Sequence, residues 1–113
     1  MIYALDTNIL SFMLRKDRRV CDRYRSESRK GGECIIPPIA YYEIKRGLLR
    51  ANATAQVQRF DALCRDFGVG EMNAQMWDEA ARIYAALQKQ GRPISDADIL
   101  IDAFSNASQI LEM

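Results

Sequence analysis

The stretch Ile2-Tyr3-Ala4-Leu5-Asp6-Thr7-Asn8 decides the fold class of this chain. Its four leading apolar residues predict a short buried strand that ends at Asp6, and Thr7 or Asn8 can cap a helix that runs to about Leu14. A strand that passes directly into a helix is typical of α/β folds, in which ligands bind beyond the carboxyl ends of the strands. Asp6 therefore stands where a functional site is expected. A helix cap or Asx turn is the structural alternative for this residue.

The rest of the chain repeats the alternation of strands and helices. A second buried strand is expected over residues 33–36, ended by Pro37-Pro38, and a weak third strand over residues 67–70. Helices are expected over residues 17–30, 38–51, 54–66, 73–90 and 96–105. This order predicts a single α/β domain over residues 1–113, with a short parallel sheet flanked by helices on both faces.

The composition is that of an ordinary soluble globular domain. The chain has 113 residues, of which 49% are hydrophobic and 27% charged, and no apolar run approaches the ~20 residues of a membrane span. The N-terminus lacks the basic start and long apolar stretch of a signal peptide. Three cysteines without CxxC spacing disfavour a disulfide scaffold or a zinc ribbon. We therefore expect a cytoplasmic protein that has no membrane partner.

Histidine is absent from the sequence. Its absence excludes Ser-His-Asp and Cys-His catalysis, as well as zinc or haem sites with histidine ligands. Chemistry near neutral pH must then come from carboxylates, amines, thiols or a bound metal. Because Mg²⁺ and Mn²⁺ prefer oxygen ligands, an acidic site in this chain points to one of these ions.

Glu43 is a second candidate for such a site. It lies inside the helix expected after Pro37-Pro38, and its neighbours one turn away, Ala40 and Gly47, leave room around the carboxylate. A glycine inside a helix costs about 0.5–1 kcal/mol relative to alanine, which suggests a packing or access reason for Gly47. The alternative is a surface Glu43 that pairs with Arg46 at i+3.

Asp96 and Asp98 open the last expected helix, and Asp102 follows one turn after Asp98. Ser95 with an acid three residues later fits a variant of the capping box, which is the structural alternative. Asp98 and Asp102 share one helix face, and two carboxylates ~4 Å apart repel by about 4 kcal/mol at an effective dielectric of ~20. Acids that converge in this way take up protons or bind a cation. A divalent metal is the simpler solution near pH 7.

Positive charge is concentrated in residues 15–30, which contain 8 basic and 3 acidic residues in a chain whose net charge is +1. A segment of this kind can meet phosphates or an acidic partner. A solvated helix face is the alternative.

The aromatic residues are expected to pack rather than to bind bases. Trp77 and Tyr84 lie with Leu87 on one stripe of the helix over residues 73–90, which favours core or dimer contacts. Tyr41 and Tyr42 precede Glu43, and here core packing or a protein interface is favoured over stacking on a nucleobase.

Three segments of the chain together resemble the PIN-domain ribonucleases, most closely the VapC-type toxins of bacterial toxin–antitoxin pairs. The matching segments are Leu5-Asp6-Thr7-Asn8, then Ile36-Pro37-Pro38-Ile39-Ala40-Tyr41-Tyr42-Glu43-Ile44 with Lys45-Arg46-Gly47, and finally Gly91-Arg92-Pro93-Ile94-Ser95-Asp96-Ala97-Asp98-Ile99-Leu100-Ile101. Their order and approximate spacing agree with the family over essentially the whole chain.

The resemblance implies a PIN-like three-layer fold and an endoribonuclease that depends on Mg²⁺ or Mn²⁺. It implies that Asp6, Glu43 and Asp98 are the catalytic acids that hold the metal, and that Thr7 or Asn8 orients the first of them. It also implies an RNA substrate, a VapB-like antitoxin as partner, and a homodimer. The basic residues expected to contact RNA or the antitoxin are Arg15, Lys16, Arg18 and Arg19.

The C-terminus departs from the family. A strand with a Thr-x-Asn/Asp-type motif normally follows the last helix, whereas this sequence ends 15 residues after Asp98 without that motif. We therefore expect a sheet with truncated C-terminal strands, in which Asp96 or Asp102 partly replaces the missing ligand. The alternative function is a truncated, catalytically weak or inactive relative that binds an antitoxin or itself.

Overall fold

The computed structural model describes residues 2–107 and 111–112 of the chain. The elements, in chain order, are β1 (Ile2–Ala4), α1 (Thr7–Leu14), α2 (Arg18–Arg29), β2 (Glu33–Ile35), α3 (Pro38–Arg50), α4 (Thr54–Phe67), α5 (Ala74–Lys89), α6 (Asp96–Ala107) and β3 (Leu111–Glu112). Among the described residues, no helix is both long and apolar enough to cross a membrane. Each predicted helix is present within two residues of its expected bounds.

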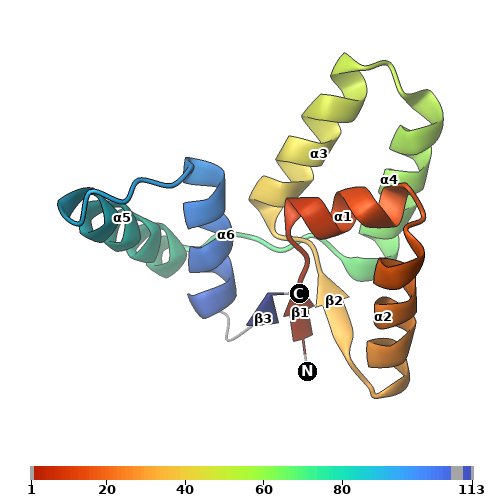
Figure 1. The fold of residues 1–113 in the computed structure, drawn as a ribbon, viewed down its shortest axis with the longest axis horizontal. Coiled ribbons are helices and arrows are strands. Elements are labelled where there is room, and N and C mark those ends of the chain that lie inside the picture. The colour runs from red at the N-terminus through yellow and green to blue at the C-terminus, as the bar shows by residue number, and fades with distance from the viewer. Residues whose placement is uncertain (1, 108–110, 113) are drawn as a thin grey trace.

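The strands form one parallel sheet with the order β2-β1-β3, so β1 is the central strand. Tyr3 of β1 lies opposite Cys34 of β2 and Leu111 of β3. Figure 1 shows the α5–α6 pair on one side of the sheet and α2 on the other, while α1 and α3 lie beyond the carboxyl ends of the strands. Helix α4 lies beside α3, and it also contacts β2. This arrangement confirms the predicted α/β class and its short parallel sheet flanked by helices.

Successive strand residues face opposite layers of the fold, as the pleat of a strand requires. Leu5 and Ile36 lie in a cluster built with residues of α1, α3 and α4. Ala4 instead lies in a second cluster with Met76 of α5 and Phe104 of α6. The sheet therefore buries both of its faces, which explains why the strand sequences are continuously apolar rather than alternating.

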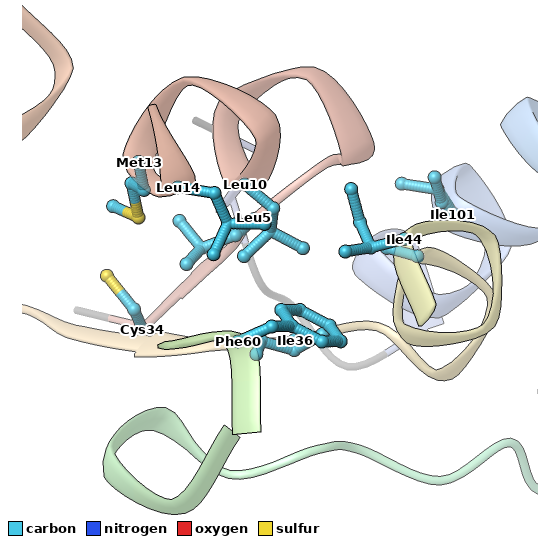
Figure 2. Close-up of a cluster of buried hydrophobic side chains, with 10 residues drawn as sticks. Leu5, Leu10, Met13, Leu14, Cys34, Ile36, Ile44, Phe60 and Ile101 are labelled. Atoms are coloured by element: carbon cyan, nitrogen blue, oxygen red, sulfur yellow. The ribbon is translucent and has the colours of Figure 1, made fainter. Parts of the chain in front are cut away.

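The larger cluster is the main core, and Figure 2 shows its side chains gathered between α1, β2, α3 and α6. Leu5, Leu10, Ile36 and Phe60 are fully buried there, and each such side chain contributes about 1.5–3 kcal/mol relative to an exposed one. Cys34 lies at the edge of this core, and burial raises the pKa of its thiol to about 11. The thiol therefore stays protonated near neutral pH.

The sheet differs from the prediction at two places, residues 67–70 and the segment after α6. Residues 67–70 contribute only a bridge between Val69 and Ile36, because Gly68 ends α4 with a φ of 84°, which no strand residue adopts. After α6, two residues pair with the open edge of β1 and form β3. Among the described residues, a short third strand therefore follows α6.

The packing of α5 is narrower than its apolar pattern suggests. Ala80 and Leu87 face the cluster formed with α6, but Trp77 and Tyr84 are 53% and 50% exposed. Of the two alternatives predicted for these aromatic residues, core or dimer contacts, the single chain does not show core burial, and dimer contacts stay a prediction. The physical reason is that α5 packs chiefly on a single helix, α6, so only one narrow stripe of it is covered.

Candidate functional site

Asp6 follows β1 directly and is the N-cap of α1. Its Oδ1 atom accepts a hydrogen bond of 2.8 Å from the backbone N–H of Ile9, so Asp6 is the cap that the sequence analysis assigns to Thr7 or Asn8. The side chain is half-buried at the carboxyl end of the central strand. The two interpretations of Asp6 are compatible, because the cap engages one of the two carboxylate oxygens.

Glu43 lies on α3 and is oriented by α1. The Thr7 hydroxyl donates a hydrogen bond of 2.7 Å to Glu43 Oε1. The alternative pair with Arg46 is present but weak, since the two charged groups are 4.0 Å apart and the Arg46 side chain is 59% exposed. Thr7 therefore positions Glu43, the second acid of the site. The resemblance instead implies that Thr7 or Asn8 orients the first acid, Asp6.

The acids of α6 are separated by their exposure. The Asp98 backbone N–H donates to Ser95 Oγ at 3.2 Å, so the capping interpretation of Ser95 holds. Asp98 and Asp96 are exposed, whereas Asp102 is half-buried. Of the three, only Asp98 lines the cavity that Asp6 and Glu43 also line.

This cavity, the acid cavity, has a volume of about 180 Å³ and lies where the end of β1, α1, α3 and α6 meet. Its lining consists of Asp6, Thr7, Asn8, Glu43, Asp98 and Ile101. Three carboxylates from three separate elements thus face one small space. The structure brings together the three acids that the sequence analysis selects, and it leaves Asp96 and Asp102 outside the described lining.

The donor set of the acid cavity fits a hard divalent cation, because its polar atoms are carboxylate, hydroxyl and amide groups. Within the described residues, however, no group of three or more acidic or cysteine side chains is close enough to ligate one ion directly. Mg²⁺ usually keeps several waters and is bound through one or two carboxylates. The residues present are therefore compatible with an ion held partly through water.

Two contacts between α3 and α4 support the position of Glu43. Tyr41 stacks on Phe60 with ring centroids 5.7 Å apart, which confirms core packing for this tyrosine. Lys45 donates a hydrogen bond to Asp61, and this carboxylate raises the pKa of the Lys45 ammonium. Tyr42 is instead 54% exposed, with the Arg46 guanidinium 5.0 Å above its ring.

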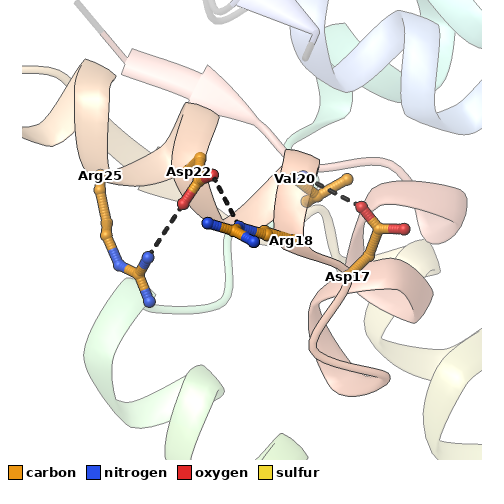
Figure 3. A network of polar contacts seen from close by, with 5 residues as sticks. All are labelled: Asp17, Arg18, Val20, Asp22 and Arg25. Carbon is orange, nitrogen blue, oxygen red and sulfur yellow. Dashed lines mark hydrogen bonds and ion pairs between the residues drawn. The ribbon is translucent and has the colours of Figure 1, made fainter.

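The basic residues after α1 have different surroundings. The Arg15 guanidinium lies 4.9 Å from the Phe12 ring centroid, and Arg15 lines a cavity beside the acid cavity. Arg18 and Arg25 are paired with Asp22 on α2, at 3.9 and 3.0 Å, as Figure 3 shows. Arg19 lines a different small cavity. Arg15 is therefore the member of the predicted basic set that adjoins the acids.

Sequence reasoning overlooks the polar residues of the cavity that Arg15 lines, among them Ser11 and Gln56. A signal for Ser11, but not for Gln56, is visible in the sequence. Asn8, Ser11 and Arg15 follow each other at i, i+3 and i+7 on α1, which gives this otherwise apolar helix one polar stripe.

Comparison with known proteins identifies the family of this chain. The PIN domain family model matches residues 3–110. "Ribonuclease VapC1" of Haemophilus influenzae strain R2866 is 26% identical over 102 residues, which cover 89% of this chain and 76% of that protein. Strain 86-028NP has a VapC1 with the same identity and coverage.

Solved structures share the fold. VapBC2 from Rickettsia felis, bound to a promoter DNA fragment, superposes with a TM-score of 0.90 at 18% identity, over 99% of this chain and 85% of that one. VapBC-1 from nontypeable Haemophilus influenzae gives a TM-score of 0.86 at 24% identity, over 99% and 84%. The match of the family model over nearly the whole chain, together with the three acids around one cavity, shows that this chain belongs to the PIN domain family.

Proposed function

We propose that the chain is a metal-dependent endoribonuclease that acts as the toxin of a toxin–antitoxin pair. The observation that carries this proposal is the acid cavity, where Asp6, Glu43 and Asp98 come together at the carboxyl end of the central strand. The similar relatives are named ribonucleases, and the similar structures are VapBC complexes. These names support an RNA substrate and a VapB-like antitoxin as partner.

The side chains of the acid cavity are arranged for this chemistry. A bound Mg²⁺ or Mn²⁺ would lower the pKa of water to give a nucleophile and would stabilise the developing charge on the phosphate. Asp6, Glu43 and Asp98 would hold it. The Ile9 N–H fixes Asp6 and the Thr7 hydroxyl fixes Glu43, so two of the three acids are oriented before any ligand binds. Such preorganisation favours the transition state over the bound substrate.

The proposed setting is the cytoplasm, where RNA is available. All three cysteines are free thiols in the structure, which suits a reducing compartment.

Metal-dependent cleavage of a mixed RNA pool tests the proposal. Purified protein is incubated with the pool in Mg²⁺ or Mn²⁺, beside a control in EDTA, and the products are separated by size. We expect cleavage with either ion and none in EDTA. If protein shown by circular dichroism to be folded cleaves nothing, the proposal fails and the inactive antitoxin-binding relative becomes the better description.

We also propose that the chain forms a homodimer through the face that carries Trp77. A cavity of about 530 Å³ lies beside this side chain, with a largely apolar lining of Pro38, Ile39, Gly70, Glu71, Met72, Trp77 and Leu100. A half-exposed tryptophan beside an apolar hollow is typical of a protein interface. A second copy is the partner that is present wherever the chain is.

The Trp77→Ser variant is therefore expected to weaken self-association by about 30-fold or more, which is the effect of truncating an interface hot spot. Light scattering coupled to size exclusion, over a range of protein concentrations, measures the change. Leu49→Ser is the control, because Leu49 is also exposed, at 57%, but lies near the far end of α3. A wild-type chain that is monomeric throughout, or equal effects of the two variants, would contradict this proposal.

A further inference from the structure

A second cavity, the α1–α3–α4 groove, opens beside the acid cavity and has a volume of about 460 Å³. Its lining consists of Thr7, Asn8, Ser11, Leu14, Arg15, Glu43, Ile44, Gly47, Leu48 and Gln56. Thr7, Asn8 and Glu43 line both cavities. A ligand in the groove would therefore be continuous with whatever is bound at the acids.

Gly47 is part of the lining of this groove. A side chain at Gly47 would meet no atom within 4 Å, so helix packing does not require a glycine here. The position is exposed and lies within α3, where a glycine lowers helix stability. Of the two reasons that the sequence suggests for Gly47, packing and access, the structure therefore supports access.

The lining of the groove has the two properties that bind a nucleobase. Leu14 and Ile44 are core residues that form the largely buried floor of the groove, and the half-buried Leu48 adds apolar surface, against which a planar ring can lie. Asn8, Ser11 and Gln56 supply amide and hydroxyl groups, which can hydrogen-bond to the edge of a base. Arg15 adds a positive charge suited to a phosphate.

We propose that the α1–α3–α4 groove binds the nucleotide next to the scissile phosphate of single-stranded RNA, and that Gln56 contacts its base. This inference rests on the proposed nuclease function. Consecutive nucleotides are covalently joined, so RNA held at the acids must continue along the neighbouring surface. The groove begins at Thr7, Asn8 and Glu43, which also line the acid cavity. The Arg15 guanidinium suits a phosphate, and the continuity of the groove with the acid cavity is what favours RNA as the occupant.

Binding and cleavage are measured separately to test this inference. Fluorescent single-stranded RNA hexamers of mixed sequence are titrated, in Mg²⁺, onto full-length protein that carries Asp98→Asn to prevent cleavage. In this background we expect Gly47→Leu and Gln56→Ala each to weaken RNA binding about tenfold. Gln58→Ala is the matched control, since Gln58 is on the same helix, exposed, and outside the described lining of the groove.

In proteins that retain Asp98, the RNA sequences at the cut sites are then compared between wild type and each variant. Gln56→Ala is expected to change the nucleotide preference at one position beside the cut, while Gln58→Ala leaves it unchanged. Unaltered affinity in both groove variants, confirmed as folded, would overturn the inference and leave the groove to a protein partner. Absence of RNA binding by the parent would overturn it as well. RNA binding that depends on the groove, without cleavage by wild type, would instead refute only the nuclease function.

Discussion

The Asp6→Asn variant is expected to cleave RNA about 10²–10³-fold more slowly than wild type and to remain folded. Asparagine is as good a helix cap as aspartate, so its side-chain oxygen can still accept the hydrogen bond from the Ile9 N–H. The substitution therefore removes one charge from the acid cavity and little else. A loss of this size is typical when one electrostatic contributor to a transition state is removed. The initial rate of cleavage of the mixed RNA pool in saturating Mg²⁺ measures it.

Asp17 provides a matched control within the same chain. It caps α2 as Asp6 caps α1, with its carboxylate accepting from the Val20 N–H at 3.2 Å, and Figure 3 shows this contact. Asp17 does not line the described acid cavity. Asp17→Asn therefore makes the same chemical change at the same kind of position and is expected to retain full cleavage. Equal activities of the two variants would show that the charge of Asp6 has no part in catalysis.

The positions of the three acids could be predicted from the sequence because each marks a local junction. Asp6 ends an apolar strand, Glu43 follows a proline pair by about one helical turn, and Asp98 lies in the first turn of α6. Such junctions depend on neighbouring residues, which a sequence displays directly. That the acids share one cavity follows from the parallel sheet, since its order places these junctions at one edge.

Other features depend on residues that are distant in the sequence. Gln56 reaches the groove only because α4 folds back beside α1 and α3, and no pattern around Gln56 indicates this. The exposure of Trp77 also depends on distant residues, because an apolar stripe on a helix does not indicate how many neighbouring helices pack against it. The strand β3 exists because its residues pair with the open edge of β1, and no motif in its own sequence predicts it.

The residue with the largest expected effect on stability is Phe60, which connects the α3–α4 pair to the sheet. It is fully buried, its ring stacks on Tyr41 of α3, and Figure 2 shows it beside Ile36, at the end of β2. Phe60→Ala is expected to lower the free energy of unfolding by about 3–5 kcal/mol, from lost burial and from the cavity left behind. Because domains are stable by only about 5–15 kcal/mol, this is a large share of the total.

Urea denaturation followed by circular dichroism measures this loss of stability. Leu49→Ala, on the exposed part of the same pair of helices, is the control and is expected to change the free energy of unfolding by less than about 0.5 kcal/mol. The Phe60 variant is also expected to cleave RNA more slowly under conditions where it is still folded, because α3 carries Glu43 and loses the contact between Tyr41 and Phe60. Similar unfolding curves for the two variants would show that the α3–α4 pair is stabilised by other contacts, and Glu43 would then need a different explanation for its position.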